Sequence, residues 1–156
     1  MSDSIQKYQN LLSVFCDQAE KYADEPYLWS KNKKYYQFLS WNDTYLRVKK
    51  LANYLKKIGI ESDSKVMLIS ENRPEWQISD LAIMAADGIS VPAYTTITSQ
   101  DYEYLINHSE TKVIIVSSKL LYSKVELALN KLKIERDVII IDDFGPKKNN
   151  LITIHK

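Results

Sequence analysis

The chain has 156 residues, 45% of them hydrophobic and 26% charged, which excludes a disordered chain and favours one folded domain. The 21 lysines and arginines nearly balance the 20 aspartates and glutamates, so the net charge of +1 indicates no nucleic-acid partner. The single cysteine, Cys16, excludes an internal disulfide, and the apolar runs are far shorter than the ~20 residues of a transmembrane segment. We therefore expect a cytoplasmic protein without a transmembrane segment, in which membrane contact would be peripheral.

The first elements in the chain are predicted to be a helix and a hairpin. Apolar residues recur at intervals of three and four between Ser4 and Tyr22, which predicts an amphipathic helix. Two aromatic-rich runs, 27–30 and 35–40, flank the basic segment 31–34. This arrangement predicts two strands joined by an exposed basic turn.

The next helix is the clearest in the sequence. Its apolar residues between Tyr45 and Ile58 fall on one face. Asn42 or Asp43 is expected to cap its beginning, and Gly59 to end it in a left-handed conformation.

Short apolar strands then alternate with helices. The expected elements are a strand at 65–70, a helix from Pro74 to about Asp87, a strand at 89–93, a helix from Ser99 to about Asn107, a strand at 112–116, a helix at 119–132 and a strand at 137–142. This alternation indicates an α/β fold with a mostly parallel sheet flanked by helices.

The composition changes after Asp143. Residues 144–150 are rich in turn-forming and basic residues, and residues 151–154 are apolar enough to begin a strand. We therefore assign residues 1–143 to the α/β part. Residues 144–156 are predicted to be a linker and the start of a further unit that the sequence does not contain.

Two loops are candidates for binding, because ligands of open parallel sheets bind at the carboxyl ends of the strands. Arg73 lies at the start of a predicted helix and is a candidate anion contact. Tyr94, Thr95 and Thr96 offer hydroxyl groups and form a candidate wall of a substrate pocket. Both loops also have a structural interpretation, as a helix start and a strand end, and we favour it.

The sequence contains no catalytic or metal-binding motif. His108 is expected at a helix end, and no serine or cysteine nucleophile motif accompanies it. Asp142 and Asp143 have no counterpart spaced for acid–base catalysis, and the isolated glycines form no phosphate-binding loop. We therefore predict that this chain alone binds no cofactor.

Several motifs follow one another between residues 71 and 110. They are Glu71-Asn72-Arg73-Pro74-Glu75-Trp76, Asp80-Leu81-Ala82-Ile83, Val91-Pro92-Ala93-Tyr94-Thr95-Thr96 and the run from Asp101 to Glu110. In order and spacing they resemble the N-terminal region of acyl-adenylate-forming, or AMP-binding, enzymes, and in particular the long-chain acyl-CoA synthetases (fatty-acid-CoA ligases). The resemblance extends from Leu11 to Asp142 and implies a partial N-terminal domain of such an enzyme.

Such enzymes activate a fatty acid with ATP and Mg²⁺ to an acyl-adenylate and then transfer the acyl group to coenzyme A. The resemblance thus implies fatty acid, ATP, Mg²⁺ and coenzyme A for the full-length protein. In the family, the loop that ends in lysine, the adenine-binding segments and the mobile C-terminal domain all come later in the chain. We therefore expect a scaffold that is inactive alone.

The sequence departs from the family at two places and leaves other functions open. Asp63-Ser64 stands where relatives have Gly-Asp, and Asp87 lies in a stretch that is usually made of small residues. We expect the turn at Asp63 to survive. The alternative function is a stand-alone, non-catalytic α/β binding or interaction module. A nucleotide-dependent enzyme complete at this length is disfavoured by the missing glycine-rich loop.

Overall fold

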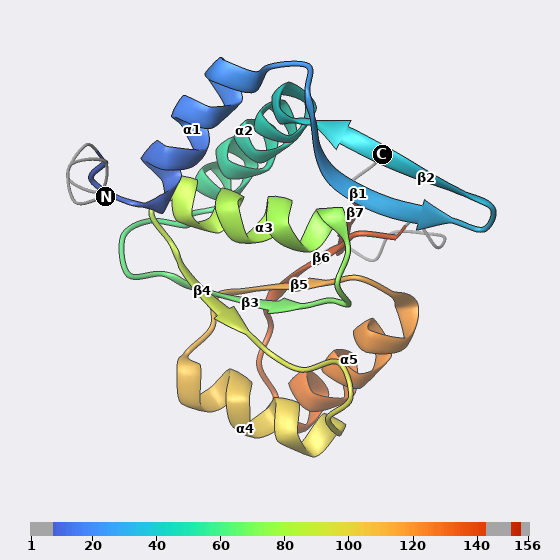
Figure 1. The fold of residues 1–156 in the computed structure, drawn as a ribbon. Coiled ribbons are helices and arrows are strands. Elements are labelled where there is room, and N and C mark those ends of the chain that lie inside the picture. The colour runs from blue at the N-terminus through green and yellow to red at the C-terminus, as the bar shows by residue number, and fades with distance from the viewer. Residues whose placement is uncertain (1–7, 143–150, 154–156) are drawn as a thin grey trace.

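The computed structural model describes residues 8–142 and 151–153, which form a two-stranded hairpin and a five-stranded sheet with helices on both faces (Figure 1). The elements are α1 (Leu11–Tyr22), β1 (Pro26–Asn32), β2 (Tyr35–Ser40), α2 (Trp41–Lys57), β3 (Lys65–Ile69), α3 (Pro74–Ala85), β4 (Ile89–Pro92), α4 (Ser99–Ser109), β5 (Val113–Val116), α5 (Lys119–Leu132), β6 (Asp137–Ile140) and β7 (Leu151–Thr153). Among the helices described, none is both long and apolar enough to cross a membrane.

The five-stranded sheet is parallel and has the strand order β4-β3-β5-β6-β7. This arrangement confirms the predicted α/β fold with a parallel sheet flanked by helices. The strand expected near residue 151 is present and pairs with β6, with Val138 opposite Leu151. The predicted linker, 144–150, lies outside the described residues, and the division of the chain at residue 143 stays a prediction.

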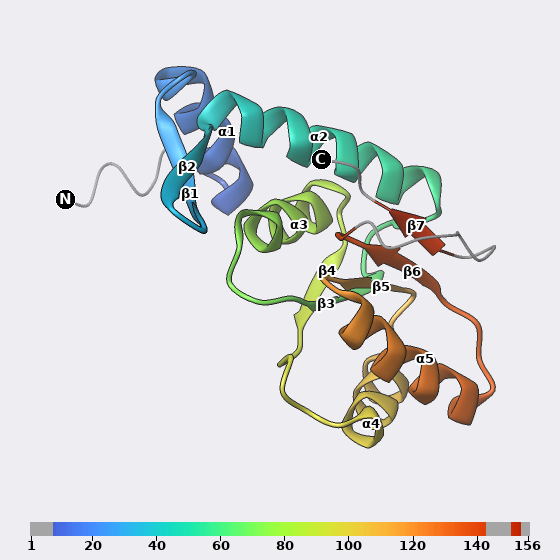
Figure 2. The ribbon, with the colours of Figure 1, turned by 90° about the vertical axis from the view of Figure 1, so that its right-hand side faces the viewer.

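The sheet separates two hydrophobic cores (Figure 2). In β3, Val66 and Leu68 face the core formed with α1, α2 and α3, whereas Met67 and Ile69 face the core formed with α4 and α5. All four side chains are fully buried. Neither face of this strand contacts solvent, which explains why its sequence is a continuous apolar run.

The predicted starts of α3, α4 and α5 are confirmed, whereas those of α1 and α2 were wrong. Ser40, and not Asn42 or Asp43, caps α2: its hydroxyl oxygen accepts from the Asp43 backbone N–H at 3.0 Å. Thr98 caps α4 in the same way, and Ser99 is the first helical residue, as predicted. The first helix begins at Leu11 with Asn10 as its cap, and residues 4–7 of the predicted helix lie outside the described residues.

Ser40 and Thr98 each exchange hydrogen bonds with the residue three positions later, at the start of the helix. The carboxylates of Asp43 and Asp101 accept from the backbone N–H of Ser40 and Thr98, respectively, at 3.3 and 2.8 Å. This capping box satisfies two N–H groups at once. A cap one residue later would lose it.

Left-handed residues join several elements. Gly59 ends the segment after α2 with φ = 91°, as predicted. Asp63 and Asp87, the two departures from the family pattern, have φ values of 65° and 64°. The turn at Asp63 therefore persists with an aspartate, a residue type that tolerates this region better than most. Asp87 also pairs with Lys56 at 3.1 Å.

Candidate functional site at the carboxyl edge of the sheet

Because β3, β4, β5 and β6 are parallel, the loops that follow them meet at one edge of the sheet. Backbone hydrogen bonds connect three of these loops. The Ser117 N–H donates to the Ile69 carbonyl at 3.0 Å, and the Asp142 N–H donates to the Ser117 carbonyl at 3.1 Å. The first polar residues after β3, β5 and β6 are thereby brought side by side, which makes this edge the candidate site.

Glu71 and Ser117 form a hydrogen bond between the loops that follow β3 and β5. The hydroxyl of the fully buried Ser117 donates to Oε2 of Glu71, while the Ser70 hydroxyl donates to the Glu71 carbonyl at 3.0 Å.

Burial raises the pKa of Tyr102 to about 12, with smaller contributions from the charges of Glu71 and Asp101. Tyr102 therefore stays protonated at neutral pH and donates to the Tyr94 carbonyl at 2.7 Å.

Arg73 lies between two carboxylates. Its Nε donates to Glu75 at 2.8 Å and its Nη1 donates to Asp142 at 2.9 Å. Burial alone would lower the pKa of Arg73, but the hydrogen bonds and charges of Glu75 and Asp142 outweigh burial and raise the pKa. The guanidinium thus ties α3 to the end of β6. An anion at Arg73 would have to compete with these ion pairs, and the predicted anion contact stays a prediction.

The Tyr94–Thr96 loop is held by its backbone and exposes side chains. Lys124 donates to the carbonyls of Thr95 and Ile97 at 3.3 and 2.8 Å, and Tyr102 holds the Tyr94 carbonyl. The side chain of Tyr94 is 82% exposed, Thr96 is exposed and Thr95 is half-buried. A surface of this kind could line a pocket only together with further residues, so the predicted pocket wall also stays a prediction.

The edge described here does not fit a nucleotide triphosphate by itself. Such a ligand needs several N–H donors and cationic groups. Carboxylates outnumber the guanidinium around Arg73, and the described glycines, Gly59 and Gly88, precede strands and so lie at the opposite edge of the sheet. Within residues 8–142 and 151–153, no group of three His, Cys, Asp or Glu residues could hold a metal ion.

An open depression lies at the opposite, amino edge of the sheet. Its lining residues are Lys112, Glu135, Arg136 and Asp137. Lys112 binds Glu61 at 3.2 Å, and the Nε of Arg136 donates to the Thr111 carbonyl at 2.6 Å. The cationic side chains of the depression are therefore engaged in holding neighbouring loops, and parallel sheets bind ligands at the other edge.

Sequence reasoning missed part of the carboxyl edge. The sequence patterns do not single out Ser117, and they assign Asp142 only to the end of a strand. The signal was available: Ser117 directly follows the buried strand β5, and Asp142 follows β6 after one further buried residue, Ile141. Which of them meet could not be predicted, since the contacts join residues 46 and 69 positions apart.

Comparison with known proteins places the chain in a family. The sequence profile described as "AMP-binding enzyme" matches residues 15–156. The chain therefore belongs to the AMP-binding enzyme family, which confirms the predicted family.

The curated relatives include long-chain acyl-CoA synthetases. The chain is 28% identical over 142 residues to long chain acyl-CoA synthetase 4 of Arabidopsis thaliana, which covers 88% of this chain and 21% of that protein. It is 28% identical over 136 residues to the long-chain-fatty-acid–CoA ligase ACSBG2 of Homo sapiens, covering 87% and 20%. The chain thus spans about a fifth of the length of these relatives.

Solved structures share the fold. Coronafacic acid ligase from Pectobacterium brasiliense superposes with a TM-score of 0.80 and 19% identity, covering 93% of this chain and 28% of that one. A benzoate CoA ligase from Burkholderia xenovorans superposes with a TM-score of 0.75, covering 86% and 26%. At this identity the likeness extends to the fold alone.

Proposed function

We propose that this chain forms the opening part of the adenylate-forming domain of a long-chain fatty-acid-CoA ligase. The observation that carries the proposal is the similarity of most of the chain to long-chain acyl-CoA synthetases from a plant and from mammals. The whole protein would convert a fatty acid and ATP, with Mg²⁺, to an acyl-adenylate and then to acyl-CoA. It would work in the cytoplasm and contact membranes peripherally.

The role proposed for these residues is scaffolding, and the chain alone is expected to be inactive. The Glu71–Ser117 contact and the Arg73–Asp142 ion pair support this role, because they join the ends of neighbouring strands. They also engage Arg73, so the edge offers few cationic groups that could bind a triphosphate. Tyr94 and Thr96 are exposed in the loop that follows β4. They would provide wall to a pocket that further residues complete.

The test begins with the intact mass of the native polypeptide in its source cells, together with the coding sequence downstream of Lys156. A longer product that carries a Ser/Thr/Gly-rich loop ending in lysine is expected. That product should release pyrophosphate from ATP only when a long-chain fatty acid is present, whereas residues 1–156 alone should not. A native product that ends at Lys156 would refute the ligase and favour a binding module.

The proposed pocket wall can be examined in the same assay. Tyr94→Ala should change the preference of the longer product among fatty acids of different chain length. Tyr104→Ala is the matched control, because Tyr104 is also an exposed tyrosine but lies on the outer surface of α4. Equal effects of the two substitutions would exclude Tyr94 from the pocket.

A further inference from the structure

The outer half of the β1–β2 hairpin exposes an aromatic face. Trp29 lies opposite Phe38, and Lys31 lies opposite Tyr36, so these side chains share one face of the two-stranded sheet. The exposed fractions are 55% for Trp29, 67% for Tyr36 and 48% for Phe38. The rings of Trp29 and Phe38 contact each other, with centroids 5.2 Å apart. We call these four residues the hairpin face.

The backbone explains why this face cannot join the core. A bulge between Pro26 and Leu28 shifts the register, and the Tyr27 ring stacks on Trp41 at 3.7 Å. Beyond the bulge, Leu28 and Leu39 form the next cross-strand pair and pack against the core. Because side chains alternate along a strand, the pairs that follow on the other side must point away from the body.

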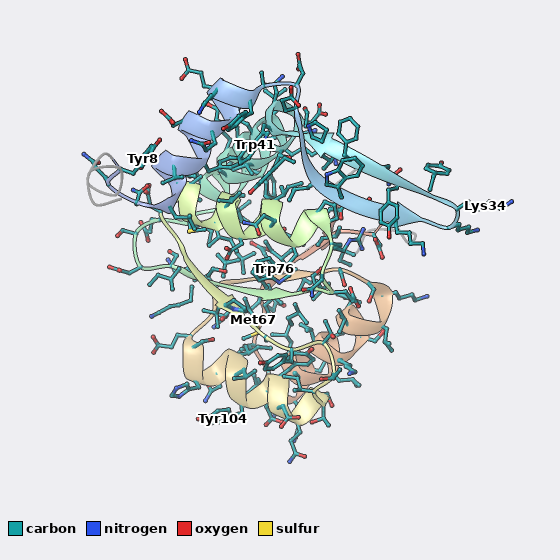
Figure 3. The ribbon with its side chains drawn as sticks, in the orientation of Figure 1. Tyr8, Lys34, Trp41, Met67, Trp76 and Tyr104 are labelled. Carbon is teal, nitrogen blue, oxygen red and sulfur yellow. The ribbon has the colours of Figure 1, made fainter. Side chains whose placement is uncertain are left out.

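The tip of the hairpin adds positive charge. Lys31, Lys33 and Lys34 are exposed, and residues 26–40 contain no aspartate or glutamate. Within the described part of the chain, none of these lysines forms an ion pair. Figure 3 shows Lys34 at the end of the hairpin, far from Trp41 at its base and from the sheet around Met67.

We propose that the hairpin face and its lysine tip bind the surface of an anionic phospholipid membrane. Tryptophan and tyrosine favour the interface between lipid headgroups and hydrocarbon, because each has an apolar ring and a polar group. Lysines beside them meet the negative potential of the lipid surface. The hairpin projects from the body, so it can reach a membrane while the α/β part remains in water (Figure 1).

This inference rests on the peripheral membrane contact proposed above and assigns it to particular residues. Anionic lipid matches both properties of the hairpin, since a bilayer surface offers negative charge and an apolar layer beneath it. A single nucleic-acid strand offers negative charge and stacking bases but no apolar layer, and the test below distinguishes it from a membrane.

The test measures cosedimentation of the full chain with vesicles of phosphatidylcholine, with and without phosphatidylserine. Each lysine near an anionic surface strengthens binding about fivefold, so K31Q/K33Q/K34Q should weaken partitioning onto phosphatidylserine vesicles about a hundredfold. W29S/F38S should weaken it at least about tenfold, because these rings would no longer enter the interface.

The chain offers matched controls for both variants. K49Q/K50Q/K57Q removes the same charge from the exposed side of α2, and L120S/L127S removes exposed apolar side chains from α5. Both controls should bind vesicles like the parent. Thermal unfolding of all variants confirms that each one is folded. Tryptophan emission should shift to the blue when anionic vesicles are added, and the shift should be absent in Trp29→Phe.

Three outcomes would overturn the proposal. They are equal binding to both kinds of vesicle, equal loss in the hairpin variants and their controls, and tighter hairpin-dependent binding of oligothymidylate than of phosphatidylserine vesicles. The vesicle assay does not depend on catalysis. The vesicle and pyrophosphate assays together therefore distinguish a ligase that does not bind membranes from a membrane-binding protein without ligase activity.

Discussion

At the scale of single residues, Asp101 shows how a cap couples stability to pH. It accepts hydrogen bonds from the hydroxyl and the backbone N–H of Thr98, at 2.6 and 2.8 Å. These bonds hold the pKa of Asp101 below its ordinary value, and the small effect of burial opposes them. The carboxylate therefore stabilises the folded chain only while it is ionised.

We predict that Asp101→Asn removes a pH-dependent part of the stability. Because the folded-state pKa is lowered, the contribution is present above the unfolded value of about 4 and is lost as the pH falls through the folded-state pKa. The difference in unfolding temperature between the parent and the variant should therefore be largest near neutral pH and shrink in acid. Glu135→Gln, which removes one exposed carboxylate elsewhere, is the control. A difference that is constant with pH would contradict the prediction.

Arg73 illustrates the limit of reading a residue by its type. A cation at the start of a helix suggested an anion contact, yet the structure surrounds it with Glu75 and Asp142. Only Glu75 is near in sequence. The partner that decides what Arg73 can do comes from the end of β6, and no local pattern indicates that approach.

At the scale of elements, the hairpin and α2 are joined through the cap residue. Ser40 ends β2, pairs with Pro26 and caps α2 with its hydroxyl. It is also buried, at 7% exposed. One side chain thus fixes the point at which a strand becomes a helix, and the neighbouring candidates Asn42 and Asp43 are left inside the helix.

We predict that Ser40→Ala lowers the free energy of unfolding by about 1 to 2 kcal/mol, because the Asp43 N–H loses its acceptor at a buried helix start. Denaturant unfolding measures the change. Ser123→Ala is the control: its hydroxyl donates to the Lys119 carbonyl inside α5, where such a bond contributes little to the helix. A loss for Ser40→Ala no larger than that of Ser123→Ala would show that the cap is dispensable.

At the scale of the whole molecule, the parallel sheet acts as a wall between two cores. Ile83 belongs to the core under α2 and α3, and Ile106 belongs to the core under α4 and α5. By contrast, Ile60 and Ile83 lie on the same side. A Cβ on Gly88 would lie 3.0 Å from a methyl of Ile60 and 3.3 Å from a methyl of Ile83.

We predict that the losses of unfolding free energy from core substitutions on opposite sides of the sheet are additive, whereas those from substitutions on the same side are coupled. Ile83→Val and Ile106→Val should each cost about 0.5 to 1.5 kcal/mol, and the double variant should match their sum within about 0.5 kcal/mol. The pair Ile60→Val and Ile83→Val should depart from additivity by more than that. Denaturant unfolding of the single and double variants provides the energies. Equal coupling in both pairs would show that the sheet does not separate the cores.

The sequence by itself determined the class of fold, most of the elements and the family. Apolar runs such as Val113–Val116 predict buried strands because a strand covered on both faces needs apolar side chains throughout, and the motifs from Glu71 to Thr96 carry the family resemblance. These signals are local. Each one depends on residues that are neighbours in the chain.

Only the tertiary structure decided the strand order and the contacts at the carboxyl edge. The order β4-β3-β5-β6-β7 brings Ser117 to Glu71 and Asp142 to Arg73. The sequence also predicted the aromatic hairpin but not which face would be left exposed, since one bulged residue near Tyr27 sets that choice. In each case the deciding energy comes from segments that meet only after folding, so no local pattern contains it.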